Sequence, residues 1–94
     1  MWKFELFFKG NIYSKTMTMT DDRPAKFEVN SKKLHDVVII VETYAMLLGE
    51  AGAVVYPVGV DDTFGFTKVD VSTLYFKNAT AGENGKISIL GVEE

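Results

Sequence analysis

Polar and apolar residues alternate along the first 19 positions of the chain, and this pattern predicts a β-hairpin. Gly10 and Asn11 lie between two runs rich in aromatic and β-branched residues, a pair that favours a two-residue turn in which glycine supplies the positive φ. One face of this hairpin collects apolar side chains around a single charge, Lys15: Trp2, Phe4, Leu6, Phe8, Tyr13, Met17 and Met19. A one-residue slip would mix the two faces, so the pattern predicts register and buried face together.

Two apolar residues, Phe7 and Ile12, fall on the opposite, polar face near the turn. One interpretation is that the C-terminal tail or a neighbouring loop covers them. The other is that they form an exposed patch that contacts a partner or a second copy of the chain.

The hydrophobic period changes after residue 30. Ser31 is a favourable N-cap, Gly49 or Gly52 is a favourable stop, and the apolar residues between them recur at spacings of three and four: Leu34, Val37, Val38, Val41, Tyr44, Ala45 and Leu48. This spacing predicts a helix of roughly 18 residues that lies across the apolar face of the hairpin.

The remaining segments are predicted as strands. Ala25, Phe27 and Val29 alternate with polar residues as a short third strand, and residues 53–60 form an apolar run whose Pro57 indicates an edge or a bulge. Asp61 and Asp62 then form a turn, residues 68–75 alternate as the next strand, residues 78–85 form a polar loop, and residues 87–92 form the last strand. We therefore expect one α+β domain over residues 1–94, with the order β-β-β-α-β-β-β and an antiparallel sheet packed on one central helix.

Composition adds constraints to this picture. Ninety-four residues, 47% of them hydrophobic, suit one folded domain and exclude a disordered chain. The absence of cysteine excludes a disulfide scaffold, a thiolate nucleophile and a cysteine-based zinc site. One helix on one sheet has difficulty covering so much apolar surface, so we expect a partner, identical or foreign, to cover part of it.

Charge is distributed unevenly along the chain. The net charge is −3, but residues 1–33 hold seven basic and four acidic residues, whereas residues 34–94 hold three basic and nine acidic ones. An acidic surface repels phosphate backbones and favours basic partners. Its predicted members are Asp61, Asp62, Asp70 and Glu83; the alternative is that these residues only keep the domain soluble.

No residue pattern indicates catalysis. The single histidine, His35, falls in the first turn of the predicted helix, where the helix dipole disfavours its charged form, and no nucleophile elbow accompanies it. The pairs Asp21–Asp22 and Asp61–Asp62 lack the spacing of a calcium-binding loop, and no glycine-rich phosphate loop is present. We expect no enzyme activity, no cofactor and no metal ion. Lysines interleaved with Phe4 and Phe8 resemble a nucleic-acid stacking platform only loosely, because the core requires those aromatic rings.

These observations predict a non-enzymatic, protein-binding protein that inhibits or modulates a partner by occupying its surface. The expected partner is another protein, including a nucleic-acid-binding one with a basic surface, and neither nucleic acid itself nor a membrane. Size and charge alone are similar to those of phage-encoded inhibitors of host defence such as anti-CRISPR proteins, and no family motif accompanies this analogy. Lys3 and Glu5 interrupt any signal-peptide run, so we expect a cytoplasmic protein, in the host cytoplasm if it is viral. The alternative is a homo-oligomeric module, such as a homodimer, with a structural or small-ligand-binding role.

Overall fold

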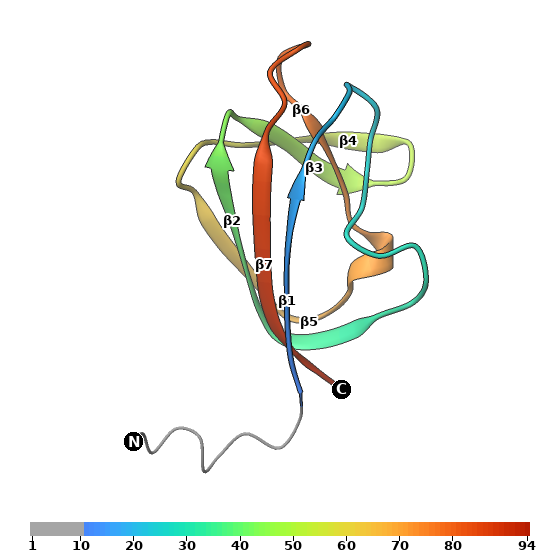
Figure 1. Ribbon diagram of the computed structural model, residues 1–94. Coiled ribbons are helices and arrows are strands. Elements are labelled where there is room, and N and C mark those ends of the chain that lie inside the picture. The colour runs from blue at the N-terminus through green and yellow to red at the C-terminus, as the bar shows by residue number, and fades with distance from the viewer. Residues whose placement is uncertain (1–10) are drawn as a thin grey trace.

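The computed structural model describes residues 11–94, which form two antiparallel β-sheets (Figure 1). Sheet A has the strand order β1-β7-β2-β5 and contains β1 (Ile12–Thr18), β2 (Lys33–Thr43), β5 (Thr63–Asp70) and β7 (Lys86–Glu93). Sheet B has the order β4-β3-β6 and contains β3 (Met46–Glu50), β4 (Ala53–Val58) and β6 (Tyr75–Asn78). A short 3-10 helix, η2 (Val71–Thr73), joins β5 to β6, and residues 11–94 contain no α-helix. The predicted α+β fold with a central helix is therefore wrong.

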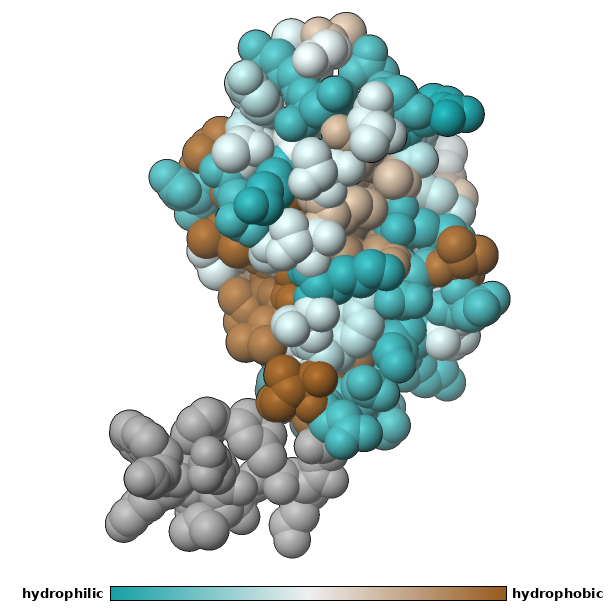
Figure 2. Space-filling view, in the orientation of Figure 1, coloured by the Kyte–Doolittle hydropathy of each residue, from teal (hydrophilic) through white to brown (hydrophobic). Residues whose placement is uncertain are grey.

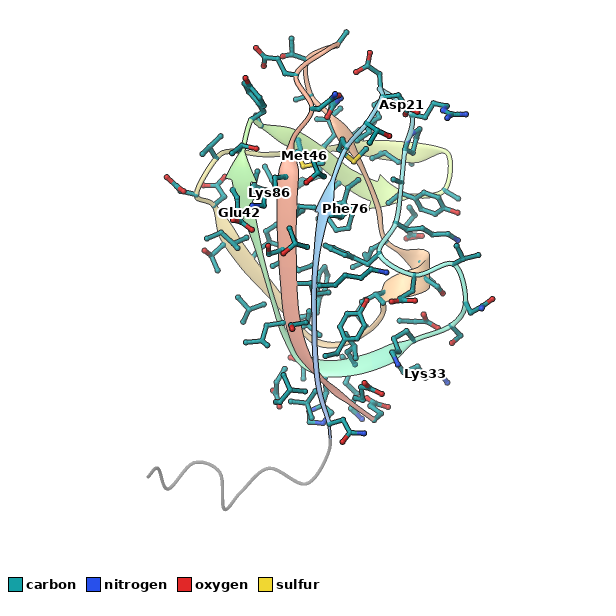
Figure 3. All side chains as sticks on the ribbon, in the orientation of Figure 1. Asp21, Lys33, Glu42, Met46, Phe76 and Lys86 are labelled. Atoms are coloured by element: carbon teal, nitrogen blue, oxygen red, sulfur yellow. The ribbon has the colours of Figure 1, made fainter. Side chains whose placement is uncertain are left out.

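The core lies between the two sheets. In Figure 1 the strands of sheet A face the viewer, and β3 and β4 run across behind them. Met46 of β3 and Phe76 of β6, both labelled in Figure 3, are completely buried. They pack in one cluster with the buried side chains of sheet A, which include Leu34, Val37, Ile39, Val41, Ile87 and Ile89. The second sheet thus covers the apolar face that the predicted helix was expected to cover.

The segment predicted as a helix forms β2 and β3 because its centre is a run of five β-branched residues, Val37–Val41. Such side chains lose rotamer freedom in a helix and pack well on a pleated sheet. Their exposure alternates with a period of two: Val37, Ile39 and Val41 are buried, whereas Val38 and Ile40 are exposed. This is the period of a strand with one face in the core.

Two backbone irregularities give this strand pair its helix-like spacing. Asp36 has a φ of 50°, and the pairing of β2 with β7 shifts by one residue between His35 and Val38. This bulge lets both Leu34 and Val37, three residues apart, face the core. Tyr44, with a φ of 58°, turns the chain between β2 and β3 and resets the pattern again. The three- and four-residue spacings between apolar residues therefore result from a bulge and a turn, and not from a helix.

Other sequence-based expectations have mixed outcomes. Instead of a third strand at residues 25–29, the structure shows a single bridge from Ala25 to Phe76, with Phe27 buried and Val29 exposed. The strand expected over residues 68–75 is interrupted by η2. The first strand of the predicted hairpin lies outside the described residues. Its second strand is confirmed as β1, which pairs with β7, and Tyr13 and Met19 are buried.

Several elements are confirmed. Residues 53–58 form β4, and Pro57 lies on an edge strand, where a residue without an N–H is tolerated. Asp61, with a φ of 69°, lies in the turn that leads into β5. The predicted loop of residues 78–85 is confirmed from residue 79 onward, whereas Asn78 is the buried last residue of β6, and the last predicted strand lies within β7.

Residues 19–32 connect β1 to β2 and close one side of the space between the sheets. The Tyr13 hydroxyl donates to Glu28 Oε2 at 2.6 Å, and Lys15 Nζ donates to the Phe27 carbonyl at 2.8 Å and to Glu28 Oε2 at 3.3 Å. Burial, followed by the bond to Glu28, raises the pKa of Tyr13, while the bonds from Tyr13 and Lys15 lower the pKa of Glu28. Phe27 also packs edge-on against Phe76, with ring centroids 5.4 Å apart. Polar contacts and the buried Phe27 ring together close this side of the molecule.

Candidate functional site

The outward surface of sheet A carries a contiguous group of apolar side chains, which we call the outer face: Ile12, Val38, Ile40 and Leu90. Val38 and Leu90 are direct cross-strand partners, Ile40 follows two residues after Val38 on the same face, and Ile12 pairs with Val92 beside Leu90. These four side chains are 36–51% exposed. Figure 2 views sheet A from this side and shows apolar residues gathered over its left part. The β-branched and leucine side chains suit a sheet, but no described element covers them.

A polar cluster borders the outer face at one end. The Ser88 hydroxyl donates to the Glu42 carboxylate, the Thr16 and Ser88 hydroxyl oxygens lie 2.8 Å apart, and Lys86 Nζ lies 3.9 Å from Glu42 Oε1. Figure 3 shows Glu42 and Lys86 side by side on β2 and β7. Each charge in this cluster therefore has an opposite charge or a hydroxyl nearby. The outer face thus has an apolar centre and a polar margin, the arrangement typical of protein–protein contacts.

The predicted acidic residues Asp61 and Asp62 lie together in the turn between β4 and β5, and both are exposed. Asp62 Oδ2 accepts the N–H of Gly59 at 2.7 Å, and the backbone N–H of Asp61 donates to the Val41 carbonyl at 2.7 Å. These bonds hold the turn against the end of β2. Both side chains are exposed to solvent, and one carboxylate oxygen of Asp62 is bonded within the turn.

Asp70 lies at the other end of β5 and has an internal role. Its carboxylate accepts from the hydroxyls of Ser31 and Ser72 at 2.5 and 2.7 Å and from the N–H groups of Lys32 and Ser72, both at 3.0 Å. These bonds, first that from Ser31, hold its pKa well below the usual range. Asp70 thereby caps η2 and ties it to the start of β2.

The predicted acidic residues are therefore not all in one place. Asp70 follows Asp62 by eight positions of extended chain, which corresponds to about 26 Å. Glu83 lies in the separate loop between β6 and β7 and is exposed. Of this set, only Asp61 and Asp62 are neighbours in the chain.

Of the predicted apolar pair, Ile12 is 49% exposed, and Phe7 lies outside the described residues. Sequence reasoning missed the three other members of the outer face. Val38 belongs to the apolar stripe of the predicted helix and Ile40 lies within the same predicted helix, although the alternation within the β-branched run is the signal that reveals both as outward-facing. Leu90 lay in a predicted strand, where its alternation with Ile89 could have placed it outward.

A groove of about 400 Å³ lies between β4 and β5, on the side of the sandwich opposite to the connection formed by residues 19–32. Its lining is mostly apolar, with Asp62 as the one charged member: Leu48, Tyr56, Pro57, Val58, Asp62, Thr63, Phe64, Gly65 and Phe66. β4 and β5 are the terminal strands of their sheets, so the groove runs between two strand edges. One side of the sandwich is thus closed, and the other is open and apolar.

His35 lies on β2 and not at the start of a helix. Its Nδ1 is 2.9 Å from Asp36 Oδ2, and both side chains are partly or largely exposed. Within residues 11–94, no group of three His, Asp or Glu side chains is close enough to share a metal ion. No helix in this part of the chain is long and apolar enough to cross a membrane.

Comparison with protein-family models, with curated proteins and with solved structures found no match to this chain.

Proposed function

We propose that the chain is a non-enzymatic protein-binding domain that contacts its partner through the outer face of sheet A. The observation that carries this proposal is the group of neighbouring apolar side chains on the outward face of sheet A, which are all exposed: Ile12, Val38, Ile40 and Leu90. Contiguous exposed apolar surface on a small domain is typical of an interaction site. The polar margin at Glu42 and Lys86 adds directional contacts around an apolar centre.

The charge of the partner is a second part of the proposal. Asp61 and Asp62 present exposed carboxylates and favour a partner with basic residues, as on a nucleic-acid-binding protein. Asp70 is left out of this role because Ser31, Lys32 and Ser72 occupy its carboxylate. A cytoplasmic partner is part of the proposal, since the chain lacks the cysteines that stabilise many small secreted domains.

The proposal is tested by affinity capture from a lysate of the native cell, with the full chain as bait. The doubly substituted bait Val38→Lys/Leu90→Lys places two charges in the outer face, where both side chains are already about half exposed. We expect it to capture the specific partner at least about tenfold less well than the wild type, since charges at the centre of an apolar contact are strongly unfavourable.

The matched control is Val29→Lys/Val55→Lys, which makes the same change at two exposed valines outside the outer face. It should capture the same proteins as the wild type. Equal capture by both double variants, or no specific capture by the wild type, would contradict the proposal. Urea unfolding of all baits shows that they are folded.

A further inference from the structure

The sequence of β5 and the residue before it is symmetric about Gly65. Residues 62–68 read Asp-Thr-Phe-Gly-Phe-Thr-Lys, so that equal residues lie at equal distances on both sides of the glycine, and opposite charges end the segment. Glycine is required at position 65 for the packing of a single copy, because a Cβ there would lie 2.6 Å from the Val37 carbonyl oxygen. No contact within a single copy explains why the residues on the two sides of Gly65 are the same.

The outer edge of β5 is open. β5 pairs with β2 on one side, and no described strand pairs with its other side. The N–H of Val41 donates to the carbonyl of Asp62 at 3.2 Å. Since hydrogen bonds alternate along an antiparallel pair, Phe64 and Phe66 also bond to β2, and Thr63, Gly65 and Thr67 direct their N–H and C=O groups to the open side.

We propose that two copies of the chain pair antiparallel through β5, with the two-fold axis at Gly65. Gly65 then faces itself, Thr63 faces Thr67 of the second copy, and these are the residues whose backbone groups point outward. Phe64 faces Phe66 of the second copy, and Asp62 faces Lys68. The glycine, threonine and phenylalanine residues each face a residue of the same type, and aspartate faces lysine. Such matching is what a self-complementary two-fold contact requires.

Charge selects this register among those with the correct hydrogen-bond pattern. Moving the axis by one residue, to Phe66, places Asp62 opposite Asp70 of the second copy. The axis at Gly65 instead forms two ion pairs, one at each end of the contact. Cross-strand opposite charges stabilise a pair of strands, whereas like charges destabilise it.

The apolar groove beside β5 also favours a second copy of the chain at this edge. Phe64 and Phe66 are half-buried, contact each other edge-on with centroids 6.2 Å apart, and line the groove with Tyr56 and Leu48. Across the axis, the two phenylalanine pairs come together over the two grooves and cover apolar surface that one copy leaves open. The two A sheets become one eight-stranded sheet, which also removes the free edge of β5.

Sedimentation equilibrium of the full chain tests the proposal. The wild type should show a reversible monomer–dimer equilibrium. Lys68→Asp and Asp62→Lys each place like charges opposite one another and should weaken the dimer at least about tenfold. The double variant Asp62→Lys/Lys68→Asp exchanges the charges and should restore most of the dimer.

Two controls make the result specific. Lys77→Asp makes the same charge change on β6, away from the edge of β5, and should leave the dimer unchanged. Circular dichroism and urea unfolding establish that each variant is folded. If Asp62→Lys disturbs the turn, Asp62→Asn and Lys68→Gln provide the same comparison without added like charge, with each weakening the dimer.

A wild type that stays monomeric at all concentrations overturns the proposal, as does a folded double variant that fails to recover the dimer. Loss of the dimer in Val38→Lys/Leu90→Lys, with no effect of the substitutions in β5, would also overturn it and assign self-association to the outer face. The proposed function is judged separately through Lys68→Asp, because this variant leaves the outer face and the Asp61–Asp62 pair intact.

Discussion

Asp70 shows how one carboxylate can be withdrawn from a predicted binding role by the bonds it makes inside the fold. It accepts four side-chain and backbone hydrogen bonds, and its own carbonyl accepts one from the Thr73 hydroxyl at 2.7 Å. The residue therefore joins the end of β5, the cap of η2 and the segment before β2. The bonds from Ser72 are local, whereas Ser31 and Lys32 are far away in the chain, so the local sequence does not indicate that Asp70 ties η2 to the segment before β2.

The lowered pKa of Asp70 predicts how stability depends on pH. A carboxylate whose pKa is lower in the folded than in the unfolded state stabilises the fold above its unfolded value, near 3.8, and this stabilisation is lost as the pH falls below that value. We expect Asp70→Asn to lower the urea midpoint at neutral pH and to make the acid loss of stability less steep.

Urea unfolding from pH 7 to pH 2 measures both effects. Glu83→Gln, a change to an exposed loop carboxylate, should leave the neutral midpoint unchanged. An Asp70→Asn variant with the wild-type midpoint and the wild-type acid slope would show that the negative charge of Asp70 contributes nothing to stability.

At the scale of elements, strands with an uninterrupted pattern could be predicted and those with a bulge could not. β1, β4 and β7 alternate or run apolar between clear turn residues, and the sequence predicts each of them. β2 could not be predicted by periodicity, because the bulge at Asp36 and the turn at Tyr44 convert a two-residue period into apparent helical spacing. The five consecutive β-branched residues favour a strand, and they are the sequence feature that indicates β2 correctly.

β6 depends on contacts that no local pattern reveals. Phe76 is completely buried, packs edge-on with Phe27, and exchanges backbone hydrogen bonds of 2.8 Å with Ala25 in both directions. At the end of the strand, the amide of the buried Asn78 donates to Asp22 and Asn84 and accepts from the N–H of Gly85. These contacts attach the segment of residues 19–32 to sheet B.

Phe76→Ala tests the importance of this attachment. Removal of a fully buried phenylalanine leaves a cavity between the sheets and should lower the free energy of unfolding by about 3–5 kcal/mol. The control Val55→Ala, at a side chain that is 73% exposed, should change it by less than about 0.5 kcal/mol. Urea unfolding measures both values.

A loss below about 1 kcal/mol for Phe76→Ala would mean that Phe76 contributes little to the packing between the sheets, since even small core deletions usually cost that much. If Phe76→Ala does not fold, Phe76→Leu should give a smaller loss in the same direction.

At the scale of the whole molecule, the sequence predicts more apolar surface than one helix and one sheet can bury, and the structure shows which parts of this surface are buried and which are exposed. The second sheet, not a helix, covers the inner face of sheet A, and the connection of residues 19–32 closes one side. The outer face and the groove beside β5 are still open. The sequence predicts only Ile12 of the outer face, because the extent of this face and the position of the groove depend on which strands become neighbours and which lie at an edge.

The two open surfaces have separate proposed occupants. The outer face is assigned to a foreign protein, and the edge of β5 to a second copy. In a dimer formed through β5, the outer faces of both copies lie on the same side of one continuous sheet. Such a dimer offers a partner two equal contact sites, and two linked sites bind a partner with repeated features more tightly than one.

The most direct test of the outer face is methyl cross-saturation by NMR. In this experiment, a captured partner is irradiated and the isoleucine, leucine and valine methyl groups of this chain are observed. The account predicts that the methyl signals of Ile12, Val38, Ile40 and Leu90 lose intensity, whereas those of Val29 and Val55, which are more exposed but lie elsewhere, do not. Signal loss confined to Val29, Val55 or other methyl groups away from sheet A would contradict the account.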